Sequence, residues 1–306
     1  MNLMVCLDFI LGVMMQVFNT QTDQTSLITA TWDHAVNSKA KLQSALTSES
    51  KMIEADVITG HLVDEVEEEK TDRIPIMGHP PSITSDLSLK EFLNAWNNSN
   101  KILKLDFKST EAFKLASPVI ENAFKDSPPN RLPWLNADIL PGPGPGDSPG
   151  VDADTFLKVS SKSFPDSILS LGWTTKRNDN DKYSEHHINA MVDVLFKNKY
   201  MNPVTYAVRA SFAVNSISEL QYLLETSPVG STLTVWCSDS KDIINYPNLV
   251  QLINTVGANR VYLDLPDEMS KIFFDMYTSS SVGASNNVGL HSLFLASLFV
   301  LKNVFL

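Results

Sequence analysis

Strand-like and helix-like stretches alternate along most of this chain, and the alternation restricts the fold more than any other feature. Eight short stretches of branched and aromatic residues are each followed by a longer stretch with helical spacing of apolar residues. The predicted strands cover residues 28–32, 52–58, 101–108, 132–139, 167–172, 204–210, 232–237 and 260–264. Repeated strand–helix units form parallel sheets, so eight of them over roughly 250 residues predict an α/β fold of the (β/α)8 TIM-barrel type.

An open, doubly wound sheet of eight strands is the alternative to a closed barrel. No glycine-rich turn follows the first predicted strand, which argues against a dinucleotide-binding fold. The loop Pro141-Gly142-Pro143-Gly144-Pro145-Gly146 does not end the alternation, which resumes with a predicted helix over 151–164. We therefore predict a single barrel domain over residues 27–278.

Apolar segments lie at both ends of the chain. Residues 1–18 are apolar and predict a secretory signal peptide over residues 1–20, with an uncleaved anchor or an ordinary buried segment as alternatives. Small polar residues followed by an apolar tail over 279–306 are typical of a glycolipid (GPI) anchor signal, with a hydrophobic tail anchor as the alternative. The sequon Asn97-Asn98-Ser99 fits a glycoprotein of the secretory pathway. Together they predict an extracellular, cell-surface protein held at the membrane by its C-terminal anchor or tail.

The net charge limits the partners that this chain can bind. The formal charge at pH 7 is −11, which argues against a nucleic-acid partner, since nucleic-acid-binding proteins present a basic patch. Part of the acidity is local, in the run from Asp64 to Glu69, which we expect to be a solvated loop. Removal of an N-terminal segment with Cys6 would leave Cys237 alone, so the core has to hold the fold without an intrachain disulfide.

Two carboxylates lie on one face of the second predicted strand. Side chains alternate faces along a strand, so Glu54 and Asp56 share one face and the apolar residues around them share the other. Buried acids are costly unless a cation pairs with them, and a hard divalent metal ion takes oxygen ligands. The alternative is a solvated edge strand whose polar face points at water.

Polar residues stand at or near the ends of most of the predicted strands, the second strand included. In a (β/α)8 barrel the C-terminal ends of the strands form the active site, so we expect these residues to converge. They are His34, Glu54, Asp56, His79, Asp106, Lys108, Asn136, Asp138, Arg209, Trp236 and Asp264. Each alone has an ordinary alternative, such as a structural histidine, a lysine that reaches solvent or a tryptophan packed in the core.

Taken together, these side chains suit phosphodiester cleavage. Three carboxylates can hold one divalent ion, Mg²⁺ or Ca²⁺, which would neutralise charge on a phosphoryl group. Two histidines could act as base and acid, because their ordinary pKa lies near neutrality. Lys108 would bind the phosphate as a point charge.

Seven segments carry a resemblance to the menorin family. They are Trp32-Asp33-His34-Ala35-Val36-Asn37-Ser38, Ile53-Glu54-Ala55-Asp56, Met77-Gly78-His79-Pro80-Pro81, Leu105-Asp106-Phe107-Lys108, Asn136-Ala137-Asp138-Ile139-Leu140-Pro141-Gly142, Gly172-Trp173-Thr174-Thr175 and Pro203–Ala210. The resemblance covers essentially all of residues 27–266. The family is similar in turn to the glycerophosphodiester phosphodiesterases and the spider-venom-type sphingomyelinases D, which are metal-dependent barrels of the PLC-like phosphodiesterase type.

The resemblance implies roles for individual residues. His34 and His79 match the two catalytic histidines of the superfamily, and Lys108 matches its lysine. The implied metal ligands are Glu54, Asp56 and Asp106, and the expected substrate-binding residues are Asn136, Arg209 and Trp236. Trp236 corresponds to the strand-seven tryptophan of the sphingomyelinase branch, and Asp264 resembles the aspartate of the strand-eight turn.

Two departures from the superfamily pattern affect these assignments. Ala35 stands where glycerophosphodiesterases carry an arginine after the first histidine, which puts recognition of that substrate class in doubt. The acidic run lengthens the segment between Asp56 and His79, which affects the placement of His79.

Two functions from different classes follow. The first is a metal-dependent enzyme that cleaves phosphodiester or phospholipid head groups by two-histidine acid–base catalysis. The second is a catalytically inactive extracellular ligand or co-receptor that binds receptor or adhesion proteins, since menorin-family members are associated with cell-surface recognition during neuronal (dendrite) patterning. The retained acids and histidines favour the enzyme.

Overall fold

The computed structural model describes residues 26–63, 72–144, 149–176, 181–237 and 242–279. The predicted signal peptide over 1–20 lies outside the described residues, as do the apolar tail beyond residue 279 and the acidic run from Asp64 to Glu69. The predictions for these segments therefore stay predictions.

Parallel strands follow one another around a barrel in the order of the chain. They are β1 (Trp32–Asp33), β2 (Met52–Leu62), β5 (Ile102–Phe107), β6 (Trp134–Pro141), β7 (Leu169–Thr174), β8 (Val204–Arg209), β9 (Thr232–Trp236) and β10 (Val261–Asp264). Each is hydrogen-bonded to the next in parallel register. Because the described parts of β1 and β10 share no ladder, the barrel is nearly rather than fully closed.

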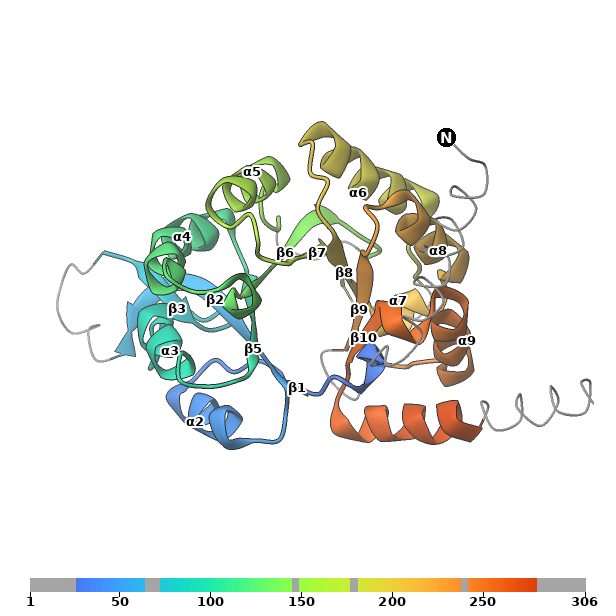
Figure 1. Cartoon of the computed structure of the whole chain (residues 1–306), viewed down its shortest axis with the longest axis horizontal. Coiled ribbons are helices and arrows are strands. Elements are labelled where there is room, and N and C mark those ends of the chain that lie inside the picture. Colours follow the sequence, from blue (N-terminus) through green and yellow to red (C-terminus); the bar gives the residue numbers. More distant parts are fainter. Residues whose placement is uncertain (1–25, 64–71, 145–148, 177–180, 238–241, 280–306) are drawn as a thin grey trace, which may run out of the picture.

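Helices surround the strands on the outside of the barrel, as Figure 1 shows in a view down the shortest axis of the molecule. They are α2 (Lys39–Thr47), α3 (Leu89–Trp96), α4 (Thr110–Phe124), α5 (Ala153–Ser163), α6 (Glu185–Lys197), α7 (Ala210–Ala213), α8 (Ile217–Thr226), α9 (Tyr246–Val256) and a final helix over 267–279. The alternation of strands and helices confirms the predicted (β/α)8 barrel. Within the described part of the chain, every helix is too short or too polar to cross a membrane.

Apolar side chains pack between the strands and the helices, while a few aromatic rings fill part of the barrel interior. Ile53, Ala55 and Val57 on β2 are fully buried, as the alternation predicts for the face opposite the two acids. Trp32, Trp134 and Tyr262 come from β1, β6 and β10, and their ring centroids lie 5.0 to 6.5 Å apart in edge-to-face pairs. These rings also join β1 to β10 across the unpaired seam of the barrel.

The first predicted strand, over 28–32, was wrong in its bounds. Residues Leu27–Thr29 form a short 3-10 helix in which the Thr29 hydroxyl donates to the Ser26 carbonyl, and only Trp32–Asp33 pair with β2. Thr29 therefore satisfies a backbone carbonyl locally, as threonine does in turns, instead of extending the ladder.

β2 is longer than predicted, because the chain folds back on it. β3 (Ile74–Met77) pairs antiparallel with the second half of β2, and β4 (Thr84–Ser85) pairs with its last residues. This excursion lies between the second and third barrel strands and carries His79 on the segment that follows β3.

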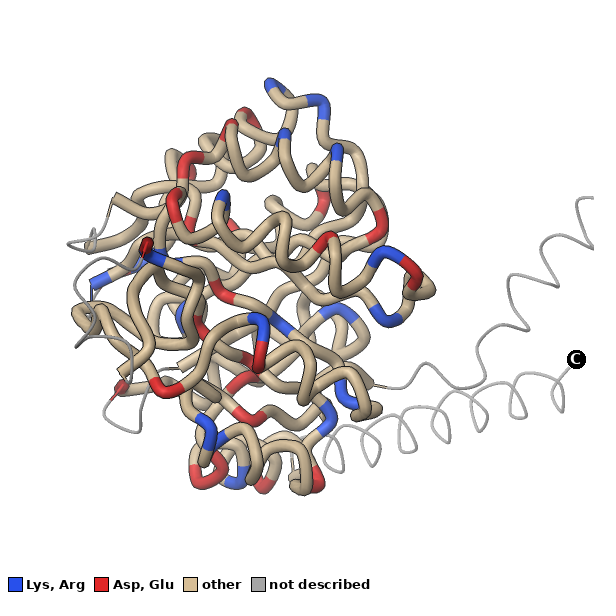
Figure 2. Tube along the Cα trace, turned by 90° about the vertical axis from the view of Figure 1, so that its left-hand side faces the viewer, with Lys and Arg blue, Asp and Glu red and all other residues tan. Residues whose placement is uncertain are grey.

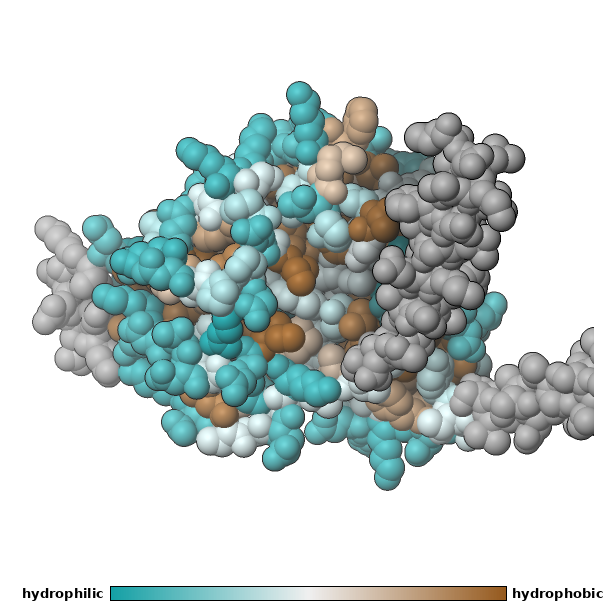
Figure 3. Space-filling model, in the orientation of Figure 1, coloured by the Kyte–Doolittle hydropathy of each residue, from teal (hydrophilic) through white to brown (hydrophobic). Residues whose placement is uncertain are grey.

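The charged residues are distributed rather than gathered into one basic surface. Figure 2 shows lysine and arginine interspersed with aspartate and glutamate along the described trace. The face seen in Figure 3 is mostly hydrophilic, with apolar residues showing mainly near its middle.

Candidate active and metal site

A cavity of about 520 Å³ lies at the C-terminal ends of the barrel strands. The strand register places its polar residues, because Asp56 on β2 pairs with Asp106 on β5, and Asp106 pairs with Asn136 on β6. Glu54 lies two residues earlier on β2 and therefore points to the same side as Asp56. Every residue predicted to act in the site lines this cavity: His34, Glu54, Asp56, His79, Asp106, Lys108, Asn136, Arg209 and Trp236.

The carboxylates of Glu54, Asp56 and Asp106 form the centre of the site. Each offers one oxygen, and these oxygens all lie within 4.8 Å of one another. Glu54 and Asp56 are buried, with 2% and 4% of their surface exposed, and Asp106 is half-buried. Three carboxylate oxygens at this spacing fit a hard divalent cation, which takes oxygen ligands.

Backbone and amide groups hold the two acids of β2 in place. The Ala35 backbone N–H donates to Glu54 Oε2 at 2.8 Å. The Asn37 amide donates to Asp56 Oδ2 at 2.6 Å, while the Asp56 backbone N–H donates back to Asn37 Oδ1 at 2.8 Å. Ala35 has a φ of 53°, so the turn after β1 takes a left-handed conformation that aims its N–H at the acid.

Lys108 bridges the carboxylates of Asp56 and Asp106. Its Nζ lies 2.7 Å from Asp56 Oδ1 and 2.5 Å from Asp106 Oδ2. Burial by itself would lower the pKa of Lys108, but the charges of Asp106, Asp56 and Glu54 outweigh burial and raise the pKa well above its usual value. Burial would likewise raise the pKa of Asp106, yet the Lys108 ammonium holds that pKa below its usual value. Lys108 thus places a cation beside the acids.

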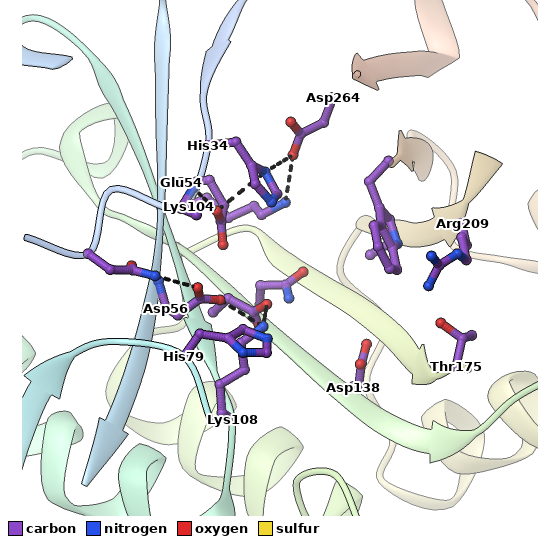
Figure 4. Close-up of a pocket in the computed structure, with 16 residues that line it drawn as sticks. His34, Glu54, Asp56, His79, Lys104, Lys108, Asp138, Thr175, Arg209 and Asp264 are labelled. Carbon is purple, nitrogen blue, oxygen red and sulfur yellow. Dashed lines mark hydrogen bonds and ion pairs between the residues drawn. The ribbon is translucent and has the colours of Figure 1, made fainter. Parts of the chain in front are cut away.

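The two histidines lie on opposite sides of the carboxylates of Glu54 and Asp56 (Figure 4). His34 Nδ1 is 3.2 Å from Asp264 Oδ2 and 3.4 Å from Glu54 Oε2. Burial by itself would lower the pKa of His34. The nearby charges of Glu54 and Asp264 together outweigh burial and raise the pKa to about 9. His79 Nδ1 is 2.7 Å from the Pro80 carbonyl, which can only accept, so a neutral His79 ring carries its lone pair on Nε2.

A second group of residues lines the far side of the cavity. The Arg209 guanidinium donates from Nε and Nη2 to the two Asp242 oxygens, at 2.9 and 2.8 Å. The Arg209 Cζ atom lies 5.2 Å from the centre of the Trp236 ring. Asp138 and Thr175 belong to this group, and Thr175 lies beside Arg209 in the view of Figure 4. Burial and the nearby charge of Asp106 raise the pKa of Asp138 to about 7.

Gly172 makes room for the Asp138 carboxylate. A Cβ on Gly172 would lie 2.2 Å from Asp138 Oδ1, closer than any non-bonded carbon and oxygen approach each other. The glycine of the Gly172–Thr175 segment therefore has a steric role beside the cavity.

The sequence prediction missed Lys104 and Asn37 and did not assign Asp138 or Thr175, all of which line the cavity. Lys104 carried a usable signal, because Lys104, Asp106 and Lys108 alternate along one strand and must share a face. Asp242 had no such signal in the sequence, since it lies in a loop 33 residues beyond its partner Arg209.

The chain matches the model of the Menorin N-terminal domain over residues 26–270. It is 37% identical to the human protein FAM151B over 246 residues, which cover 79% of this chain and 84% of that protein.

Two solved structures named as putative glycerophosphoryl diester phosphodiesterases are also similar. The protein from Silicibacter pomeroyi is 12% identical with a TM-score of 0.46, over 82% of this chain and 95% of that chain. The protein from Agrobacterium tumefaciens is 8% identical with a TM-score of 0.48, over 82% of this chain and 98% of that chain.

Proposed function

This chain belongs to the menorin family, and from that premise we propose that it is a metal-dependent phosphodiesterase whose site lies at the C-terminal ends of the barrel strands. In this proposal Glu54, Asp56 and Asp106 hold one divalent ion, Mg²⁺ or Ca²⁺. His34 and His79 transfer protons, Lys108 binds the phosphate, and Asn136, Arg209 and Trp236 contact the rest of the substrate.

One observation carries the proposal. The oxygens of three carboxylates lie within 4.8 Å of one another, with a histidine on each side and a lysine ammonium in contact with two of the acids. A purely structural cluster would be costly, because each buried acid must be paired to be stable. A site for a cation and a phosphoryl group explains why acids, histidines and a lysine occur together.

The side chains would divide the work of the reaction as follows. When bound, a divalent ion would neutralise negative charge on the phosphoryl oxygens. Lys108, whose ammonium contacts two of the acids, adds a point charge to the same group. Nε2 of His79 can accept or return a proton while the Pro80 carbonyl holds Nδ1, and His34 exchanges protons on the opposite side of the acids.

Metal binding is the first test. We expect isothermal titration of the purified protein with Mg²⁺ and with Ca²⁺ to show one saturable site, and Asp56→Asn to weaken binding at least about tenfold, because it removes one of three charged ligands. The matched control is Glu121→Gln, which removes an exposed carboxylate on α4 and leaves the affinity unchanged. Failure of the wild-type protein to bind either ion would contradict the proposal and favour an inactive extracellular ligand or co-receptor.

The cellular location is a second part of the proposal. The apolar segments at the two ends of the sequence support a secreted protein tethered to the cell surface through residues 279–306. If the tether is a glycolipid, phosphatidylinositol-specific phospholipase C releases the protein from intact cells into the medium. Protein that stays on the cells after this treatment, but is extracted by detergent, has a membrane-embedded tail instead.

A further inference from the structure

Lys104 is a buried cation that the proposed reaction does not use. It lies on β5, two residues before Asp106, and only 5% of its side chain is exposed. Its Nζ lies 3.6 Å from Asp264 Oδ2 and 4.9 Å from the centre of the Trp32 ring. A buried ammonium is costly unless it is paired, so the position of Lys104 calls for a reason.

The partner of Lys104 connects it to His34. Asp264 is the last residue of β10, is 3% exposed, and its Oδ2 contacts both the Lys104 ammonium and His34 Nδ1. The same oxygen therefore faces a fixed cation on one side and the imidazole on the other. Burial would raise the pKa of Asp264, but His34 and Lys104 together hold it below its usual value, so the carboxylate stays an acceptor for Nδ1.

His34 needs such support because of its place in the barrel. It follows β1, which is two residues long and pairs with β2 alone among the described strands. The backbone around His34 is thus fixed from the β2 side, through Val36 N–H to the Glu54 carbonyl and Ala35 N–H to the Glu54 carboxylate. On the β10 side, where no ladder is formed, the contact from Asp264 takes its place.

We infer that Asp264 and Lys104 are positioning residues that hold the His34 ring with Nδ1 bound and Nε2 directed at the substrate. Lys104 orients the Asp264 carboxylate, and Asp264 orients His34, so neither needs to touch the substrate. This inference rests on the proposed function, in which His34 transfers a proton.

Kinetics on a generic phosphodiester, bis(4-nitrophenyl) phosphate, at saturating Mg²⁺ separates positioning from substrate binding. We expect Lys104→Met to lower kcat by about 10- to 100-fold with KM within about twofold of wild type, since a mispositioned acid–base group affects the chemical step. Asp264→Asn should lower kcat further. Lys104→Arg keeps the cation and should recover most of the loss. A rise in KM at unchanged kcat would show that Lys104 binds substrate and would overturn the inference.

Lys101 provides a matched control. It is also a buried lysine, 9% exposed, but its Nζ donates to the Ser48 and Ser50 carbonyls outside the cavity. Lys101→Met therefore loses a buried cation without touching the Asp264–His34 contact. If Lys101→Met lowers kcat as much as Lys104→Met does, the effect is general destabilisation and the inference is wrong.

A measurement without turnover keeps the two proposals separate. In ¹⁵N-histidine-labelled protein, the Nδ1 proton of His34, assigned by its absence in His34→Gln, should give a downfield resonance that Asp264→Asn abolishes and Lys104→Met weakens. This result in a protein with no phosphodiesterase activity would sink the proposed function and support the positioning pair. A resonance unchanged in both variants would overturn the positioning pair.

Discussion

Replacing His34 by asparagine is expected to lower kcat of the proposed reaction, measured on bis(4-nitrophenyl) phosphate, by about 10²- to 10⁴-fold, the usual contribution of a positioned acid–base group. Asparagine keeps much of the shape of the ring but cannot exchange a proton with the substrate. The affinity for Mg²⁺ should stay within about tenfold of wild type, because Glu54, Asp56 and Asp106 remain in place. Steady-state kinetics and isothermal titration on the same preparation measure both quantities.

The control for this variant is another histidine outside the cavity. His186 is exposed on α6, so His186→Gln should leave kcat, KM and the metal affinity unchanged. His79→Asn should resemble His34→Asn, since His79 is expected to exchange a proton on the opposite side of the acids. A His34→Asn enzyme that keeps more than about a tenth of wild-type kcat would exclude His34 as an acid–base group.

The largest loss of stability is expected at Asp242. Its carboxylate is fully buried and accepts two hydrogen bonds from Arg209, whose side chain is 9% exposed. Asp242→Ala leaves the guanidinium buried without its carboxylate, so we expect the free energy of unfolding to fall by about 3–5 kcal/mol. That is a large fraction of the 5–15 kcal/mol typical of a folded domain, and equilibrium unfolding in urea measures it.

An exposed ion pair of the same length tests whether burial is the cause. Lys197 Nζ lies 2.8 Å from Asp154 Oδ2, but Lys197 is 68% exposed. Lys197→Ala should therefore cost far less stability than Asp242→Ala, because water already screens this pair. The double variant Arg209→Met/Asp242→Leu should recover much of the lost stability, because both charges leave the interior together. A loss below about 1 kcal/mol for Asp242→Ala would show that solvent reaches the guanidinium.

The sequence alone predicted the architecture and the acidic centre of the site for identifiable reasons. Period-two alternation placed Glu54 and Asp56 on one face and Ile53, Ala55 and Val57 on the other. Asp106 was expected from its place on the third predicted strand and from the menorin resemblance, and the register of β2 with β5 sets it beside Asp56. Alternation is a local property, so it can be read from neighbouring residues. The cluster of three acids is therefore the part of the cavity that the sequence determines most directly, while the roles of its residues stay predictions.

Contacts that depend on distant partners were not predictable in the same way. The strand over 28–32 was misplaced because the Thr29 hydroxyl donates to the nearby Ser26 carbonyl and the chain forms a turn there. β2 was predicted too short because its second half pairs with β3, a strand that follows only after residue 71. The Arg209–Asp242 pair joins a strand to a loop, which no periodicity records. Lys104 could have been found from its alternation with Asp106, but its partner Asp264 lies 160 residues away along the sequence (264 − 104).

The open seam between β1 and β10 has a consequence for when the proposed activity would arise during folding. The contact from His34 to Asp264 spans 230 residues of sequence and joins the first and last strands of the barrel. Loop-closure entropy makes such a contact among the slowest to form, so His34, the proposed proton-transfer group, is aligned only when the two ends of the barrel meet. Folding intermediates with most of the sheet in place would still be inert, and the appearance of turnover during refolding would report the completion of the barrel.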